Sequence, residues 1–267
     1  MKNHILKALV LKLYWIPSWE LGVVIFGIFG AFSLIGLYVG RSRMSRYAHK
    51  SNDLVFNFVA IAGVVYALAV GLIAVATWDK FKSVQDVAND EAYALNNLFL
   101  DSNGLPAADA ADVKERVRQY LHFAIEKEWP AQMHGERIEG GDALALGIMT
   151  KLTNVQTSSS RQDVLLGQAL TELNRFLSQR RARENALDEA LPGVLYFLVL
   201  GGAAVLIGMT YLLWTEEFWL QFALTLSLSA MISLMVFLIV AMDHPLWGPV
   251  SASPEAFRNV LDTIGHM

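Results

Sequence analysis

The chain has 267 residues, of which 54% are hydrophobic and 17% charged, and its net charge is −4. An average soluble domain is closer to one quarter charged, so this composition favours a membrane protein. The negative net charge gives no electrostatic basis for nucleic-acid binding, which usually needs a basic surface. Cysteine is absent, which excludes disulfides, iron–sulfur clusters and thiolate zinc sites and leaves the redox compartment undetermined.

Four long segments contain no Asp, Glu, Lys or Arg. A helix that crosses the hydrocarbon core of a bilayer needs about 20 apolar residues, and each segment approaches or exceeds that length. No strand-like alternation occurs in the chain. The sequence therefore predicts an all-α integral membrane protein with four transmembrane helices and an extramembrane helical domain inserted between helices 2 and 3. The four segments are Leu21–Tyr38, Leu54–Trp78, Pro192–Trp214 and Phe218–Met242.

The predicted organisation has five parts. An interfacial N-terminal segment at residues 1–18, in which lysines alternate with apolar residues, precedes an uncleaved first helix. Residues 19–78 contain transmembrane helices 1 and 2, and residues 79–191 form the soluble helical domain. Residues 192–242 contain transmembrane helices 3 and 4. A turn and a short amphipathic tail occupy residues 243–267.

Helical periodicity continues beyond the second span. No Pro or Gly stops the helix at Trp78-Asp79, and apolar residues recur at three- and four-residue spacing to about Leu100. We expect one helix of about 65–70 Å. Further helices are predicted at 107–129, ended by Pro130, near 142–156, and from 161 into the third span.

Charge near the helix ends gives conflicting indications of orientation. The short loop at 41–53 has four Lys or Arg, which favours that side as cytoplasmic. The opposite side has more basic residues next to the membrane, so we expect the soluble domain to be cytoplasmic and the protein to be a multi-pass inner-membrane protein. Those residues are the N-terminal lysines, Lys80, Lys82, Arg180, Arg181 and Arg183.

Span two has two contrasting faces. Small residues on one face allow close approach of transmembrane backbones and indicate helix packing. The opposite face is mostly apolar and is a candidate pore lining, because apolar constrictions can gate by dewetting. Packing alone is the alternative for both faces. The packing candidates are Ala60, Gly63, Ala67 and Gly71, and the pore-lining candidates are Asn57, Ile61, Val65, Leu68 and Leu72.

Span four carries Thr225, Ser229 and Ser233 at four-residue spacing. Their hydroxyl groups can bond to helix carbonyls or to a neighbouring helix, so we treat them as further packing candidates. A hydrated path is the alternative. No Asp, Glu, Lys, Arg or His lies within any of the four spans, which weighs against a proton-driven transporter.

Charged residues also gather at one edge of the predicted membrane region. Such side chains either snorkel and pair at the headgroup level or surround a vestibule that concentrates ions. In a vestibule, arginines would favour anions and Asp79 would favour cations. The candidates are Asp79, Arg180, Arg181, Arg183 and Asp243.

Enzymatic motifs are missing. The chain has no phosphate-binding loop, nucleophile elbow or zinc-protease motif, so we expect no enzymatic activity and no cofactor. His122 and Glu126 lie one helical turn apart, but no third ligand at helical spacing accompanies them. They are therefore expected to form an ordinary surface pair and not a metal site.

Short patterns follow one another along residues 56–257: Gly63-Val64-Val65-Tyr66-Ala67, Trp78-Asp79, Asp90-Glu91-Ala92, Tyr120, Glu128-Trp129-Pro130, Arg180-Arg181, Leu191-Pro192 and Asp243-His244-Pro245-Leu246-Trp247-Gly248. In their joint order they resemble the bestrophin-like family of bacterial four-span membrane proteins, a domain-of-unknown-function family. Leu246-Trp247 stands where the family pattern would have Phe.

Bestrophins proper are homopentameric anion channels with four spans per subunit, and their second span lines the pore. The resemblance implies an oligomeric ion channel, anion-permeable, with span two around the axis; the implied partners are the lipid bilayer, further copies of the chain and inorganic ions. A non-conducting scaffold or sensor that binds a partner through its soluble helices is one alternative. A stator-like energy-coupling subunit is another, although the intramembrane acid expected for it is missing.

Overall fold

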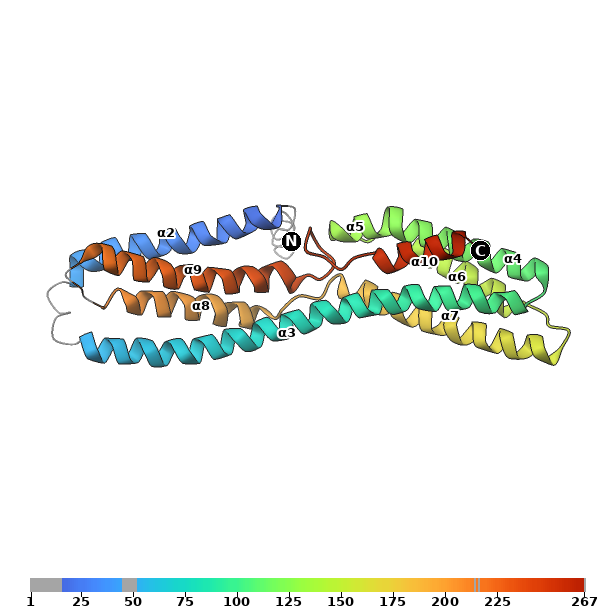
Figure 1. Ribbon diagram of the computed structural model, residues 1–267, viewed down its shortest axis with the longest axis horizontal. Helices are drawn as coiled ribbons and strands as arrows, with labels where there is room; N and C mark the ends of the chain where they lie inside the picture. Colours follow the sequence, from blue (N-terminus) through green and yellow to red (C-terminus); the bar gives the residue numbers. More distant parts are fainter. Residues whose placement is uncertain (1–15, 45–51, 214, 216, 267) are drawn as a thin grey trace. The chain divides into compact units, whose positions relative to one another are not determined.

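The computed structural model describes residues 16–44, 52–213, 215 and 217–266 (Figure 1). Most of the expected interfacial segment and part of the basic loop lie outside these residues. The described chain divides into two compact units, each taken by itself below. The membrane unit comprises described residues up to Asp79 together with 190–243, and the extramembrane unit comprises 80–189 and 244–266.

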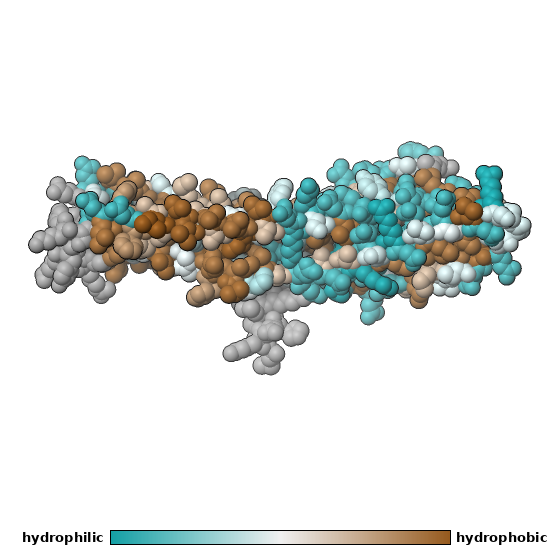
Figure 2. Space-filling model, turned by 90° about the horizontal axis from the view of Figure 1, so that it is seen from below, coloured by the Kyte–Doolittle hydropathy of each residue, from teal (hydrophilic) through white to brown (hydrophobic). Residues whose placement is uncertain are grey.

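The membrane unit contains four helices that are long and apolar enough to cross a membrane. They are α2 (Ser18–Met44), the first part of α3 (Asn52–Asp101), α8 (Gly193–Thr210) and α9 (Phe218–Asp243). These helices confirm the four predicted spans. The surface of this unit is largely hydrophobic, as the brown side chains in Figure 2 show. A surface of this kind is suited to lipid and not to water.

The core of the membrane unit is made of aliphatic side chains from all four helices. They recur at three- and four-residue spacing, so each helix turns one apolar stripe toward its neighbours. The cluster consists of Leu21, Ile25, Val70, Ile73, Val199, Ala203, Leu206, Ile207, Ile232, Val236 and Ile239.

One glycine permits a close contact between α3 and α8. A Cβ atom at Gly202 would lie 2.6 Å from the ring of Tyr66. The same ring reaches α8 with its hydroxyl group, which donates to the carbonyl of Val199 at 2.9 Å. Gly202 therefore provides the space in which the Tyr66 ring packs against α8, while its hydroxyl group is hydrogen-bonded within the apolar core.

The described residues of the extramembrane unit form helices joined by loops. The unit contains the second part of α3, followed by α4, a π-helical segment, α5, α6, α7 and the C-terminal helix α10. The single long helix predicted across Trp78-Asp79 is confirmed, since α3 ends at Asp101. The bounds are Ala107–Phe123 for α4, Ala124–Glu128 for the π-helix, Trp129–Met133 for α5, Gly141–Thr153 for α6, Ser160–Ala186 for α7 and Glu255–Gly265 for α10.

The structure corrects two predicted helix ends. Pro130 does not end the helix that begins at Ala107, because the chain widens into a π-turn at Ala124–Glu128 and continues as α5. A wider turn accommodates a residue that lacks a backbone N–H and would crowd the preceding carbonyl. The expected continuation of the third span into the soluble domain is also wrong. Helix α7 ends at Ala186 and α8 begins at Gly193, immediately after Pro192.

The segment after residue 243 is fixed to the extramembrane unit by hydrogen bonds to its backbone. Gly248 N donates to Met133 O at 2.9 Å, and the Trp129 indole donates to Ala252 O at 3.1 Å. The Gln85 side chain accepts from Ser253 N at 2.7 Å. Helix α10 then buries the apolar side chains Ala256, Phe257, Val260 and Ile264.

Candidate functional site: an exposed helix face and a buried ion cluster

The pore-lining candidates share one uncovered face of α3. Ile61, Val65, Leu68 and Leu72 are each 64–66% exposed, and Asn57 is exposed as well. The opposite face of the helix contributes Val70 and Ile73 to the core cluster. Helix α3 therefore presents a continuous row of large apolar side chains that no described part of the same chain covers.

Small residues lie beside this face. Ala60 and Ala67 are exposed, and a Cβ atom added to Gly71 would have no neighbouring atom within 4 Å. Gly63 differs, because its position faces the side chain of Leu206 at 3.9 Å on α8. Three of the four packing candidates on α3 thus lie away from the contacts that this helix makes within its own chain.

The hydroxyl residues of α9 lie against α2. Ser229 donates to the carbonyl of Phe29 at 3.2 Å and forms a hydrogen bond with the Ser33 hydroxyl group. Ser233 donates to the carbonyl of Ser229 at 2.7 Å, and Thr225 is buried on the same face. Each of these contacts joins two helices or returns a hydroxyl group to its own helix, which is how polar side chains are tolerated in an apolar bundle.

Asp243 is buried where α9 ends. Its carboxylate accepts from the backbone N–H of Leu191 at 2.6 Å and from the Tyr196 hydroxyl group at 2.7 Å. The side chain therefore ties the entrance of α8 to the exit of α9 and does not face open solvent. Asp79 and Arg181, by contrast, are exposed.

The sequence predicts Arg180 and Arg183 at the headgroup level or around a vestibule. Both are instead buried within the extramembrane unit, where their side chains are 3% and 0% exposed. The physical reason is the periodicity of α7. Its buried face, which includes Leu173 and Phe176, continues through both arginines at three- and four-residue spacing.

Arg183 forms a charge-assisted hydrogen-bond network with two buried carboxylates. Its Nε and Nη2 donate to the two oxygens of Glu91 at 2.7 and 3.0 Å, in the bidentate geometry that suits a guanidinium group. Nη2 also donates to Glu128 at 2.8 Å, and Nη1 donates to Gln132 at 2.6 Å. The guanidinium group faces the ring of Trp129, with its carbon 5.2 Å from the ring centroid.

Arg180 extends the same network toward the surface of the unit. Its Nη1 donates to both oxygens of Glu128 at 2.9 Å and to the Tyr120 hydroxyl group at 2.8 Å. Its Nη2 pairs with Glu184 at 2.5 Å and with the exposed Asp142 at 3.2 Å. Tyr120 in turn donates to Glu91 at 2.5 Å, so its hydroxyl group joins the two arginine–carboxylate pairs.

The Bestrophin-like domain matches residues 26–257, which is most of the chain. The chain belongs to the bestrophin-like family. No curated protein sequence matches it. Its fold is similar to the crystal structure of a bacterial bestrophin homologue from Klebsiella pneumoniae, with a TM-score of 0.68 and 12% identity over 91% of this chain and 98% of that one. A structure described as a membrane protein has a TM-score of 0.66 and 11% identity, covering 91% and 98%.

The ion cluster of this bestrophin-like chain keeps Arg183 charged and Tyr120 protonated. Burial disfavours the charged form of Arg183, but the carboxylates of Glu91 and Glu128 outweigh that penalty and raise its pKa well above the ordinary value. Burial, reinforced by the negative charge of Glu91, raises the pKa of Tyr120 far above 10.0, so its hydroxyl group stays protonated and able to donate.

Backbone geometry leaves no spare room at the cluster. Gly141, the first residue of α6, lies so close that a Cβ atom there would be 2.5 Å from Glu128 Oε1 and would overlap the guanidinium group of Arg180. A larger residue here would have to displace Glu128 and Arg180. The cluster is thus surrounded by five helices of the unit, α3 to α7, as well as by the π-helical segment that contributes Glu128.

The cluster has the features of a structural network and not of a catalytic or metal site. Its two buried carboxylates are matched by two buried guanidinium groups, an arrangement that favours specific packing. Among the described residues, no group of three or more His, Cys, Asp or Glu is placed to hold a metal ion. The His122–Glu126 pair is a surface contact of 3.1 Å between two largely exposed side chains.

Sequence reasoning did not identify Glu91, Tyr120, Glu128 and Gln132 as partners of the arginines. A signal for their burial was present, since Glu91 follows Val84 and Ala88 on the apolar face of α3. The short patterns that resembled the bestrophin-like family also include Glu91, Tyr120, Glu128 and Arg180. Their convergence in space, however, joins residues as far as 92 positions apart, and periodicity alone carries no information about such pairs.

Proposed function

We propose that this bestrophin-like chain is the subunit of an oligomeric ion channel in which α3 surrounds the axis. The observation that carries the proposal is the uncovered apolar face of α3. One side of the helix packs on α8 within the chain, whereas Ile61, Val65, Leu68 and Leu72 remain about two-thirds exposed. A face of this kind can point to a shared axis while the other side of the helix stays attached to its own subunit.

The flanks of that face support a ring of subunits. Ala60 and Ala67 lie on one flank, and Ala69 and Ala76 lie on the other, each pair seven residues apart. Small side chains allow neighbouring transmembrane helices to approach closely. Two different flanks, each suited to a close contact, fit the head-to-tail interfaces from which closed rings are made. The homopentamer of bestrophins is the assembly that the family resemblance suggests.

The distribution of charge favours cations over the anions that the resemblance implied. Arg180 and Arg183, two of the arginines expected to attract anions, are withdrawn into ion pairs. Asp79 is exposed and lies one turn beyond Val75 on the same face of α3 as the pore-lining candidates. A ring of Asp79 carboxylates at the end of that face would concentrate cations.

The test begins with the full chain purified in detergent, whose mass gives the number of subunits. Reconstituted vesicles are then assayed separately for potassium and chloride flux. We expect potassium flux, and we expect Leu68→Asn to increase it, because a polar side chain keeps an apolar constriction hydrated. Leu224→Asn, at a similarly exposed position of α9, is the matched control and should leave the flux unchanged.

The selectivity is tested separately with Asp79→Asn. This change should lower the preference for potassium over chloride without altering the mass of the assembly. A monomer in detergent, or silent vesicles together with a stably co-purifying protein, would contradict the channel and favour the scaffold. Chloride flux that is unaffected by Asp79→Asn would retain the channel and overturn the cation preference.

A further inference from the structure

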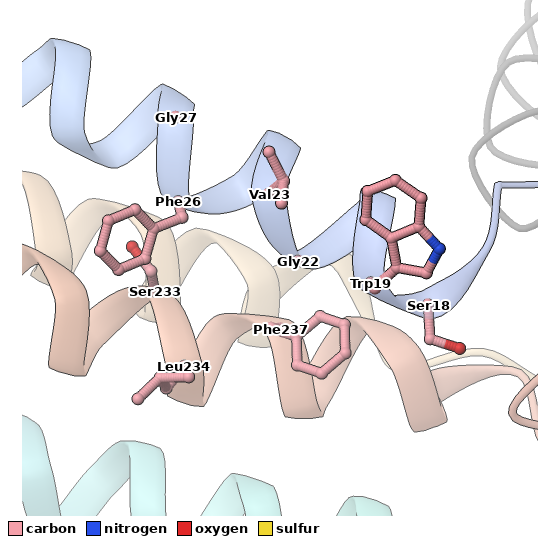
Figure 3. A pocket seen from close by; sticks show the side chains of 9 residues that line it. All are labelled: Ser18, Trp19, Gly22, Val23, Phe26, Gly27, Ser233, Leu234 and Phe237. Atoms are coloured by element: carbon pink, nitrogen blue, oxygen red, sulfur yellow. The ribbon is translucent and has the colours of Figure 1, made fainter.

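An apolar groove runs along the membrane unit between the first part of α2 and the last part of α9. Figure 3 shows its walls, in which aromatic rings from both helices stand beside two glycines. The groove has a volume of about 490 Å³. It is lined by Ser18, Trp19, Gly22, Val23, Phe26, Gly27, Ser233, Leu234 and Phe237.

The glycines make the hollow. A Cβ atom at Gly27 would meet no other atom within 4 Å, and one at Gly22 would only touch the Phe237 ring at 3.7 Å. Both positions could therefore carry a side chain without a clash inside the protein. The groove is not filled by any of the described residues, and a molecule or segment outside them must occupy it.

The lining selects an apolar occupant. Its two polar side chains are hydroxyl groups, and that of Ser233 already donates to the carbonyl of Ser229 at 2.7 Å. Trp19, Val23 and Leu234 are more than 60% exposed and would face hydrocarbon in a membrane. No water is available there to fill an apolar groove, so hydrocarbon or another apolar protein surface must do so.

The dimensions of the groove decide between these occupants. From Ser18 to Gly27 it extends over nine residues of α2, about 14 Å, which is close to half of a hydrocarbon core of about 30 Å. A transmembrane helix of a second copy would cross the whole hydrocarbon core, whereas one acyl chain occupies a single leaflet. The length of the groove therefore matches an acyl chain and not a helix of a second copy.

We propose that this groove is a binding site for one acyl chain of a membrane phospholipid. The chain lies lengthwise against Phe26, Leu234 and Phe237, and Ser18 and Trp19 mark its headgroup end. Trp is enriched at that level of the bilayer because its ring has an apolar body and a polar N–H. The bound lipid completes the surface between α2 and α9, and this role is independent of whether α3 conducts ions.

The absence of cysteine from the sequence makes a clean experiment possible. A fluorophore is attached to Leu234→Cys in the groove or to Met231→Cys, which is 68% exposed on the same helix but does not line the groove. The full chain in detergent micelles is titrated with a phospholipid whose acyl chains are brominated and quench fluorescence. Saturable quenching at low lipid content is expected for Leu234→Cys and not for Met231→Cys.

A second pair of variants fills space. Gly27→Leu places a side chain in the groove and should abolish the saturable quenching of the Leu234→Cys label. Gly208→Leu introduces the same residue at a glycine of α8 whose Cβ position is equally open, and it should change nothing. Equal quenching at both labels, or quenching that survives Gly27→Leu, would overturn the proposal. A disulfide between Leu234→Cys residues of two copies would instead assign the groove to a second subunit.

Discussion

The two units of this bestrophin-like protein have helical cores of opposite composition, one with buried charges and the other almost entirely apolar. The extramembrane unit surrounds two buried guanidinium groups with two buried carboxylates, and each charged group has several hydrogen-bond partners. The membrane unit buries aliphatic side chains and uses polar groups only for short hydroxyl contacts and the Asp243 link. Both cores are helical and well packed, but only the first depends on particular residues meeting in particular pairs.

This difference indicates how each unit should tolerate change. Removing one member of a buried ion pair leaves the other charge without compensation, which costs far more than the pair itself contributes. An aliphatic core loses only the transfer energy and packing of the atoms removed. The extramembrane unit should therefore be intolerant of single polar substitutions, whereas the membrane unit should accept conservative apolar ones.

The largest effect is expected for Arg183→Ala. Glu91 would lose its bidentate partner while remaining fully buried, and we expect a loss of about 3–5 kcal/mol in the stability of the extramembrane unit. Hydrogen exchange of α4 and α7 amides in the full chain measures this loss. Arg181→Ala, at an exposed position of the same helix, should have an effect within about 0.5 kcal/mol. Similar hydrogen exchange in Arg183→Ala and Arg181→Ala would contradict the idea that the extramembrane unit depends on its buried ion pairs.

Tyr120→Phe should have a smaller effect with a distinctive pH dependence. Loss of hydrogen bonds to charged partners should cost roughly 1.5–3 kcal/mol near neutral pH. The pKa of Tyr120 is raised in the folded state, so its contribution is present below 10.0 and is lost as the pH rises further, when the unfolded tyrosine ionises.

Stability measured against pH in the alkaline range should therefore fall less steeply for the Tyr120→Phe variant than for the unmodified chain. The exposed Tyr93 provides the control, since Tyr93→Phe should leave the slope unchanged. Parallel curves for Tyr120→Phe and the unmodified chain would show that the hydroxyl group is not held protonated by the cluster.

Gly141→Ala tests the packing around the same cluster without removing a charge. The new methyl group would press on Glu128 and Arg180, and overpacking of this kind costs about 1–3 kcal/mol. Gly147→Ala in the same helix should be neutral or stabilising by up to about 1 kcal/mol, because its nearest neighbour is the flexible end of Arg116 and alanine favours helix. The two variants are compared by thermal unfolding in detergent. We expect Gly141→Ala to unfold at the lower temperature.

The smallest effect is expected in the membrane unit. Ile207→Val removes one methyl group from a fully buried site and should cost about 0.5–1.5 kcal/mol. Val205→Ala, at a 63% exposed position on the same helix, should cost less. Detergent-induced unfolding measures both. A loss at Ile207 as large as that of Arg183→Ala would show that the apolar core is as specific as the charged one.

Sequence reasoning succeeded where a single physical signal decides the outcome. Long uncharged segments predict spans, and unbroken periodicity after Trp78 predicts that α3 continues to the end of the next apolar stripe. The prediction that Pro130 ends its helix was wrong, because a π-turn just before it accommodates a residue that has no backbone N–H. The prediction that the helix continues through Pro192 was wrong as well. The chain is not helical at Leu191, whose N–H donates to Asp243, a residue 52 positions away.

The placement of charges was the least predictable part of the candidate site. Arg181 and Arg183 are only two residues apart, yet one is exposed and the other is completely buried. Their positions on the helix could be derived from the apolar face of α7, but the identity of their partners could not. The uncovered face of α3 could be predicted as apolar, whereas what it faces could not be derived from the sequence of one chain.

The distance along the chain between Glu91 and Arg183 has a consequence for biosynthesis. These two residues are 92 positions apart, so at about 5–20 residues per second the ribosome delivers the arginine roughly 5–18 s after its carboxylate partner. During that interval Glu91 has neither arginine of the cluster beside it and must remain in water. The extramembrane unit therefore cannot close before its last long helix has been made, and nascent chains truncated before α7 should remain open to proteases.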